Sequence, residues 1–152
     1  MARSLDDARL GAWRAFLQAH AAVTEVLERE LADLRSLPLT WYDVLLQLSE
    51  APAGRLRMQE LARSVLLSKS GLTRVVDRMA KEGLVRREAA ADDARGAFAC
   101  LTPTGRSALR RAAPIHLRGI EANFGRHLTD AEAATLAGAL NRVARAAAAA
   151  QR

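Results

Sequence analysis

Apolar residues recur along this chain with helical spacing over most of its length. Near the start, steps of three and four residues define one stripe, which is the pattern of one helix face. The stripe consists of Leu10, Trp13, Leu17, His20, Thr24, Leu27, Leu31 and Leu34. Pro38 disfavours helical geometry in the residue before it, so it is expected to break this helix. Thr40 and Asp43 have capping-box-like spacing and predict the start of a second helix, which the APAG segment at 51–54 ends.

The middle of the chain predicts a helix-turn-helix. A short helix over QELARSV (59–65) is followed by a turn at residues 66–67, and Ser68 is a good N-cap for the next helix. That helix runs from Lys69 to about Glu82, and Gly83 ends it as a C′ residue. Its apolar face consists of Leu72, Val75, Val76 and Met79.

Alternation then replaces the helical spacing. LVRRE and AFACL predict two strands around the turn-like AAADDARG, so residues 84–101 are expected to form a β-hairpin with a long tip. Thr102 followed by Pro103 begins another helix. Thr129 and Glu132 form a capping box for the last one. The predicted fold class is mainly α with a small β-hairpin wing, a winged helix-turn-helix.

Residues 1–152 are expected to form one unit, with a winged-helix lobe at 40–101. The flanking helices at 5–35 and 103–150 carry apolar stripes longer than one small core can cover. Unburied stripes of this kind favour a partner chain, and a homodimer is the simplest solution. Residues 5–35 and 103–150 are therefore predicted to be dimerisation helices.

The positive charge of the chain is concentrated in one segment. The net charge is +6. Residues 55–87 hold nine Lys/Arg against three Asp/Glu, and the rest of the chain holds fourteen of each. Such a segment suits a polyanion-binding face.

The helix that begins after Ser68 is the candidate reader of DNA, because short hydroxyls and arginines near a helix N-terminus can reach base edges and phosphates in the major groove. Its DNA-binding candidates are Ser68, Lys69, Ser70, Thr73, Arg74 and Arg78. Asp77 is expected to pair with Lys81 on the same helix. At the hairpin tip, Arg95 can enter the minor groove, and Asp93 could hold its guanidinium.

The segments LLSKSGLTRVVDRMAKEGLVRR and DDARGAFACLTPTGR resemble the MarR family of bacterial transcriptional regulators. The resemblance implies an obligate homodimer whose first and last helices form the interface. It implies paired recognition helices on a pseudo-palindromic duplex operator, with Arg95 in the minor groove. It also implies a repressor released by a small aromatic or phenolic effector. Ala90 stands where the family often has another Asp, which leaves the wing tip less braced.

In that family the effector cleft lies between the dimer helices and the DNA-binding lobe. Most aromatics of this chain cluster in the corresponding stretches, and core packing explains them equally well. The effector candidates are Trp13, Phe16, His20, Trp41 and Tyr42.

Other function classes find less support in the sequence. No nucleophile–base pair, phosphate loop or dinucleotide fingerprint is present, so neither an enzyme nor a cofactor is predicted. The three histidines are far apart, so no metal site is expected. Arg55 and Arg57 either touch phosphate or are ordinary surface charges. Two alternatives stay open: a basic winged-helix module that binds an acidic protein, and a redox-sensing regulator acting through Cys100.

The single cysteine, Cys100, excludes an intrachain disulfide and fits a reducing compartment. We find no signal peptide and no membrane span. A cytoplasmic protein is therefore expected.

Overall fold

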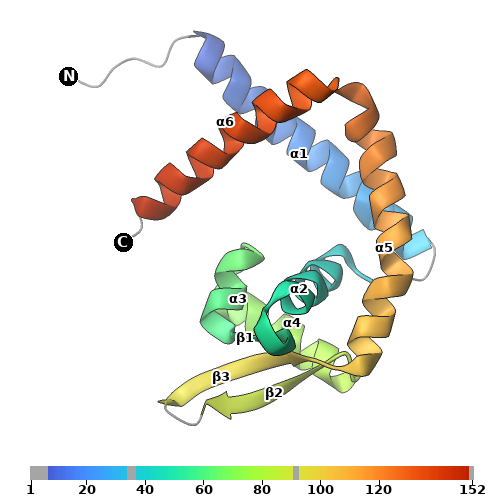
Figure 1. Ribbon diagram of the computed structural model, residues 1–152, viewed down its shortest axis with the longest axis vertical. Helices are drawn as coiled ribbons and strands as arrows, with labels where there is room; N and C mark the ends of the chain where they lie inside the picture. The colour runs from blue at the N-terminus through green and yellow to red at the C-terminus, as the bar shows by residue number, and fades with distance from the viewer. Residues whose placement is uncertain (1–6, 34–36, 91–92, 151–152) are drawn as a thin grey trace. The chain divides into compact units, whose positions relative to one another are not determined.

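The computed structural model describes residues 7–33, 37–90 and 93–150, without the side chains of residues 90 and 93–95. The chain forms helices and a small sheet in the order that the sequence predicts, which confirms the winged helix-turn-helix (Figure 1). The elements are α1 (Asp7–Asp33), α2 (Leu39–Glu50), η1 (Pro52–Gly54), β1 (Arg55–Arg57), α3 (Met58–Ser64), α4 (Lys69–Lys81), β2 (Val85–Ala90), β3 (Asp93–Leu101), α5 (Pro103–Asn123), η2 (Gly125–His127) and α6 (Asp130–Ala149).

The chain divides into two compact units. The central unit is Leu27–His116, and it holds the end of α1, all elements from α2 to β3, and the first half of α5. The terminal unit is Met1–Val26 together with Leu117–Arg152.

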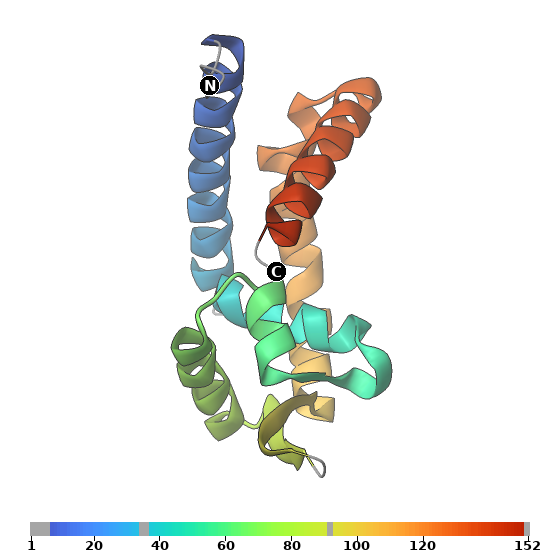
Figure 2. The ribbon, with the colours of Figure 1, turned by 90° about the vertical axis from the view of Figure 1, so that its left-hand side faces the viewer.

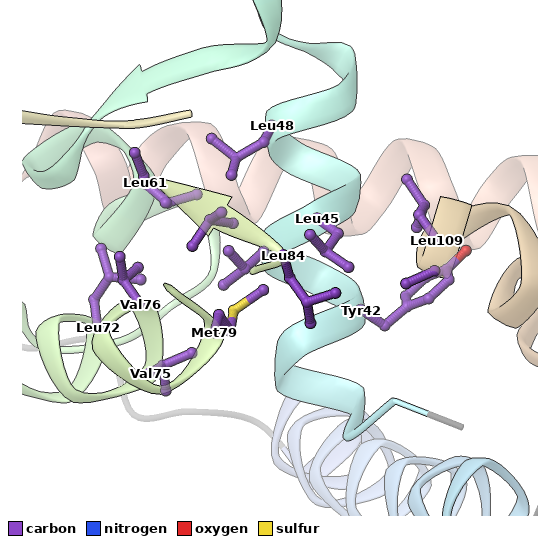
Figure 3. Close-up of a cluster of buried hydrophobic side chains, with 14 of the residues drawn as sticks. Tyr42, Leu45, Leu48, Leu61, Leu72, Val75, Val76, Met79, Leu84 and Leu109 are labelled. Carbon is purple, nitrogen blue, oxygen red and sulfur yellow. The ribbon is translucent and has the colours of Figure 1, made fainter. Parts of the chain in front are cut away.

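The core of the central unit is built where α2, α3, α4 and α5 converge (Figure 3). Leu45 and Leu48 of α2 are fully buried, as is Leu61 of α3. The four apolar residues predicted for the inner face of α4 are all buried. Truncating one such leucine or methionine to alanine costs about 2–5 kcal/mol, so this face fixes the rotation of α4 about its axis.

The sheet has three antiparallel strands in the order β1-β3-β2. The sequence predicted only the hairpin, because β1 has three residues and no alternation long enough to detect. The prediction of a long hairpin tip was wrong. Ala90 pairs with Asp93, so both strands run through most of the segment expected to be a turn. Cross-strand pairing here outweighs the low strand propensity of alanine and aspartate.

The predicted cap of α2 was also wrong. The helix begins at Leu39, before Thr40, and has Pro38 as its N-cap with no side-chain hydrogen bond. The carbonyl of Pro38 accepts from the backbone N–H groups of Trp41 and Tyr42 at 2.9 and 3.0 Å. The proline therefore sets the helix start, and Thr40 lies inside the first turn.

The other predicted caps are confirmed. Ser68 Oγ accepts from the Gly71 N–H at 3.0 Å, and Thr129 and Glu132 form a reciprocal capping box. Gly83 follows α4 with a φ of +71°. Its N–H donates to Ala80, and that of Leu84 donates to Met79. This pair of bonds is a Schellman motif, in which the residue after the C-cap adopts left-handed geometry.

The terminal unit differs from the central unit in how far its apolar residues are buried. Figure 2 separates α1 from α6, which overlap in Figure 1. Among its described residues, no hydrophobic side chain is buried. Its exposed large apolar residues are Trp13, Phe16, Leu17, Leu117, Phe124 and Val143. This unit presents apolar stripes without a core of its own.

Candidate nucleic-acid interface

The outward face of α4 carries the polar residues that the sequence singled out. Because the opposite face is locked into the core, Ser70, Arg74 and Arg78 are exposed and Thr73 is partly exposed. Ser68 and Lys69 are exposed at the N-terminal end of the helix. A helix N-terminus with exposed hydroxyls and cations can bind phosphate and base edges.

Several of these polar groups already make hydrogen bonds within the helix. Ser68 Oγ and Ser70 Oγ are 3.3 Å apart. The Thr73 hydroxyl donates to the Lys69 carbonyl at 2.9 Å, and Arg78 Nε donates to the Arg74 carbonyl at 3.4 Å. A hydroxyl that donates its proton keeps acceptor capacity, and a guanidinium with one donor engaged keeps four others. The face can therefore still bind a nucleic acid.

The helix spacing predicted an ion pair between Asp77 and Lys81, but the structure does not show this pair. The Asp77 carboxylate accepts instead from Arg87 Nη1 on β2 at 2.9 Å. The two residues are close because Arg87 points toward α4 rather than to the outer face of the sheet. This ion pair joins α4 to the wing, a contact that spacing along one helix could not predict.

The wing carries the remaining predicted DNA contacts. Asp93 and Arg95 both lie on β3, so Arg95 extends from a strand rather than from a loop. Their side chains are outside the described part of the structure, and the proposed pairing between them stays a prediction. The hairpin has an irregular register between Ala89 and Ala90.

The outer face of the sheet carries a cluster that the sequence did not indicate. The guanidinium groups of Arg55 and Arg57 lie 4.9 and 5.1 Å from the centre of the Phe98 ring, within cation–π range. Glu88 pairs with Arg55 at 3.6 Å and also with Arg86. These residues come from all three strands, so the strand register brings them together, except for Arg86 and Glu88, which are neighbours on one face of β2.

Cys100 lies beneath this cluster and is buried. Burial raises the pKa of its thiol, and a hydrogen bond to Glu88 raises it further. The same hydrogen bond is the largest cause of the lowered pKa of Glu88. A buried thiol with a raised pKa forms little thiolate, which is the reactive form.

The five effector candidates divide between the two units. Trp13, Phe16 and His20 are exposed on α1. The ring centres of Trp13 and Phe16 are 6.0 Å apart, and those of Phe16 and His20 are 6.2 Å apart. Trp41 packs partly buried against the central core, and Tyr42 is buried within it. Core packing therefore accounts for Tyr42.

Two polar neighbours of Tyr42 were missed by sequence reasoning. The ring of His116 lies 4.3 Å from that of Tyr42, centre to centre. His116 Nδ1 is buried without a hydrogen-bond partner among the described residues. Burial lowers the pKa of His116 and raises the pKa of Asp43, and each charge opposes the shift of the other. No sequence signal links residues 73 positions apart.

Within the described ranges, no group of three or more histidine, cysteine, aspartate or glutamate side chains is placed to hold a metal ion. Among the described helices, none is long and apolar enough to cross a membrane.

A helix-turn-helix with an exposed polar helix face and a β-hairpin wing defines the class of winged-helix regulators. Residues 35–96 match the family model described as "MarR family". The chain belongs to the MarR family of transcriptional regulators, as two similar solved structures show.

One is AbsC of Streptomyces coelicolor, a MarR family transcriptional regulator, at 34% identity and a TM-score of 0.85. The alignment covers 97% of this chain and 99% of AbsC. The other is Sco3205, a MarR family regulator from the same organism solved in complex with DNA. It is 35% identical with a TM-score of 0.85 over 95% of this chain and 91% of Sco3205.

A third structure, BpsR of Bordetella bronchiseptica, shares the fold at 18% identity and a TM-score of 0.78. The alignment covers 88% of this chain and 98% of BpsR. The DNA binding of BpsR is regulated by 6-hydroxynicotinic acid. The comparison with curated proteins gave no match.

Proposed function

We propose that this transcriptional regulator binds duplex operator DNA sequence-specifically through α4 and the wing. The observation that carries the proposal is the exposed face of α4, which a buried apolar face and the ion pair from Asp77 to Arg87 hold beside the wing. The DNA complex of Sco3205, at 35% identity, supports the same mode of action here.

Within this proposal the residues of α4 and the wing have different roles. Ser68 and Lys69, at the helix start, hold a phosphate. Ser70, Thr73, Arg74 and Arg78 face the major groove, where arginine reads guanine through two hydrogen bonds. Arg95 enters the minor groove from β3, and Asp93 orients it.

The regulator acts as a homodimer on a pseudo-palindromic site. The apolar stripes of α1, α5 and α6 are exposed in the single chain, and a second copy covers them. Two copies of α4 then address successive major grooves, as dimeric helix-turn-helix proteins do.

A small aromatic or phenolic effector releases the repressor from its operator. Trp13, Phe16, His20, Trp41 and Tyr42 are the candidate contacts. The effector binds more tightly to a dimer whose two α4 helices are wrongly spaced for DNA, and so shifts the population away from the bound form. A thiol switch through Cys100 finds no support, because the thiol is buried and its pKa is raised.

Fluorescence anisotropy tests the proposal. The purified protein is titrated into labelled intergenic DNA that flanks its own gene and into unrelated DNA of equal length, at two salt concentrations. Tight binding to the first DNA alone, retained at the higher salt, is expected. If the protein bound both DNAs equally and lost this binding at the higher salt, its basic face would be only a general polyanion-binding surface. That result would favour the alternative of a module that binds an acidic protein.

Two arginine variants should separate the roles of helix and wing. Arg74→Ala is expected to weaken operator binding about tenfold or more and to relax sequence choice, because a base contact is lost. Arg95→Ala is expected to weaken binding to a similar extent. Exposed Arg110 belongs to the first half of α5, outside α4, the wing and the apolar stripes of the terminal unit, so Arg110→Ala serves as the control. If both variants bound like the unchanged protein, this docking mode would be wrong.

A further inference from the structure

Leu66, in the turn between α3 and α4, adopts a left-handed backbone conformation that is unusual for a leucine. Its φ is +56°, in the left-handed region that is costly for residues with a Cβ. The residue is 89% exposed. A single exposed leucine is ordinary on a protein surface. A leucine that combines full exposure with left-handed geometry calls for a physical reason.

Leu66 comes directly after the C-cap residue of α3. Val65 is the C-cap of α3, and the Leu67 N–H donates to the Ala62 carbonyl at 3.0 Å. This is the long bond of a Schellman motif with Leu66 at C′, where glycine is usual. The apolar residue that anchors this turn is Leu67, which packs against the core. The side chain of Leu66 therefore contributes nothing visible to folding.

The turn after α3 can be compared with the turn after α4. The same motif ends α4, and there the C′ residue is Gly83, with a φ of +71°. The two turns share their geometry and differ in the side chain. Retaining a leucine at the first turn carries a conformational cost that the second avoids.

Leu66 lies close to the polar start of α4, which the proposed function places on DNA. It precedes Ser68, the N-cap of α4, by two residues, so their Cα atoms are at most about 7 Å apart. The nearby residues 68–70 are all exposed and polar. The apolar group that DNA presents in the major groove is the C5-methyl of thymine.

We propose that Leu66 is a specificity-determining residue that contacts a thymine methyl group of the operator. This inference rests on the proposed function, since it requires α4 to face the major groove. It adds an apolar contact from the turn to the polar contacts of the helix.

The test combines protein and DNA variants, using the full-length protein and the operator found by anisotropy. Leu66→Gly and Leu66→Asn both tolerate left-handed geometry, so their melting temperatures are expected to be unchanged or higher. Their operator affinity is expected to fall about tenfold. The slope of log affinity against log salt should stay the same, because no phosphate contact is lost. Leu66→Met, which keeps the apolar bulk, should retain most of the affinity.

Replacing operator thymines one at a time by deoxyuridine removes only the methyl group. At one position in each half-site, the unchanged protein should lose affinity while Leu66→Gly should show no further loss. Ala53→Gly is the matched control, because Ala53 is exposed with a φ of +55° but lies outside the turn before α4. It should bind as the unchanged protein does.

The outcomes separate this inference from the function on which it rests. If the unchanged protein showed no specific DNA binding, the proposed function itself would fail. If the unchanged protein bound specifically and the Leu66→Gly and Leu66→Asn variants bound as tightly, the thymine contact would be refuted. It would also be refuted if these variants lost as much affinity as the unchanged protein on every deoxyuridine operator. Loss of transcriptional control with intact operator binding would instead assign Leu66 to a protein partner and also overturn the inference.

Discussion

The ion pair between Asp77 and Arg87 is the residue-level link between α4 and the wing. Both side chains are about half exposed, so the pair adds less than about 1 kcal/mol to stability. It joins the outward side of α4 to the wing strand, whose place after the helix is fixed mainly by buried Leu84 and Val85. In the proposed complex these two elements enter different grooves, and their relative placement decides whether both can bind together.

His116 is a residue whose ionisation is coupled to folding through burial. Burial lowers its pKa from the ordinary value of 6.5. The unfolded chain therefore binds a proton at a higher pH than the folded one. Stability from this residue is present above pH 6.5 and is lost as the pH falls below that value. Asp43 acts in the opposite sense, because its raised pKa makes stability fall as the pH rises above its ordinary pKa of 3.8.

His116→Gln is expected to reduce the loss of thermal stability between pH 7.5 and pH 5.5. Thermal unfolding followed by circular dichroism at several pH values measures the change. The control is His20→Gln, because His20 is exposed on α1. If His116→Gln kept the full acid sensitivity of the unchanged protein, the buried imidazole would not be its source.

At the scale of elements, the start of α5 is held directly against the end of α4. The Thr102 hydroxyl lies 2.7 and 2.9 Å from the carbonyls of Gly83 and Leu84 and accepts from the Gly105 N–H at 3.0 Å. A Cβ at Gly105 would overlap the carbonyl oxygen of Leu84. This close approach is the physical reason for a threonine followed by a glycine three residues later.

Gly105→Ala is expected to destabilise the protein by about 3 kcal/mol, since backbone atoms must move to admit the methyl group. Urea unfolding measures the difference. Gly83→Ala is the matched control, because its Cβ would meet no atom within 4 Å and only its φ of +71° is unfavourable. Its cost should be about 1 kcal/mol. Equal costs for the two variants would show that the overlap at Gly105 is relieved without strain.

At the scale of the whole molecule, the two units differ in how they bury apolar surface. The central unit has a closed core, whereas the described part of the terminal unit buries no hydrophobic side chain. Val143 on α6 is 64% exposed, and Leu117 on α5 is 61% exposed. Exposed stripes on long helices are costly in water, which supports the homodimer proposed above.

Val143→Glu is expected to raise the dimer dissociation constant about a hundredfold or more, because an unpaired carboxylate would enter an apolar interface. Sedimentation velocity over a range of concentrations measures the shift. Asn141→Glu adds the same charge on the opposite side of α6 and should leave the dimer intact. A Val143→Glu protein that remained dimeric at nanomolar concentration would place the interface elsewhere.

The sequence by itself determined the longer helices, the hairpin and most of their ends, but not the short strand β1. Periodicity placed the helices, and Ser68, Gly83, Thr102 and Thr129 set local boundaries because capping uses neighbours within a few residues. Binary pattern also determined the buried face of α4, and hence which residues point outward. These features depend on short-range geometry, which the order of residues carries directly.

Only the tertiary structure decided which distant residues meet. The pairing of Asp77 with Arg87, the stacking of Arg55 on Phe98 and the contact of His116 with Tyr42 all depend on strand register or helix packing. The left-handed geometry of Leu66 likewise appears only once the turn is built. Such contacts join side chains that are local in space but distant in sequence, so periodicity and capping rules carry no information about them.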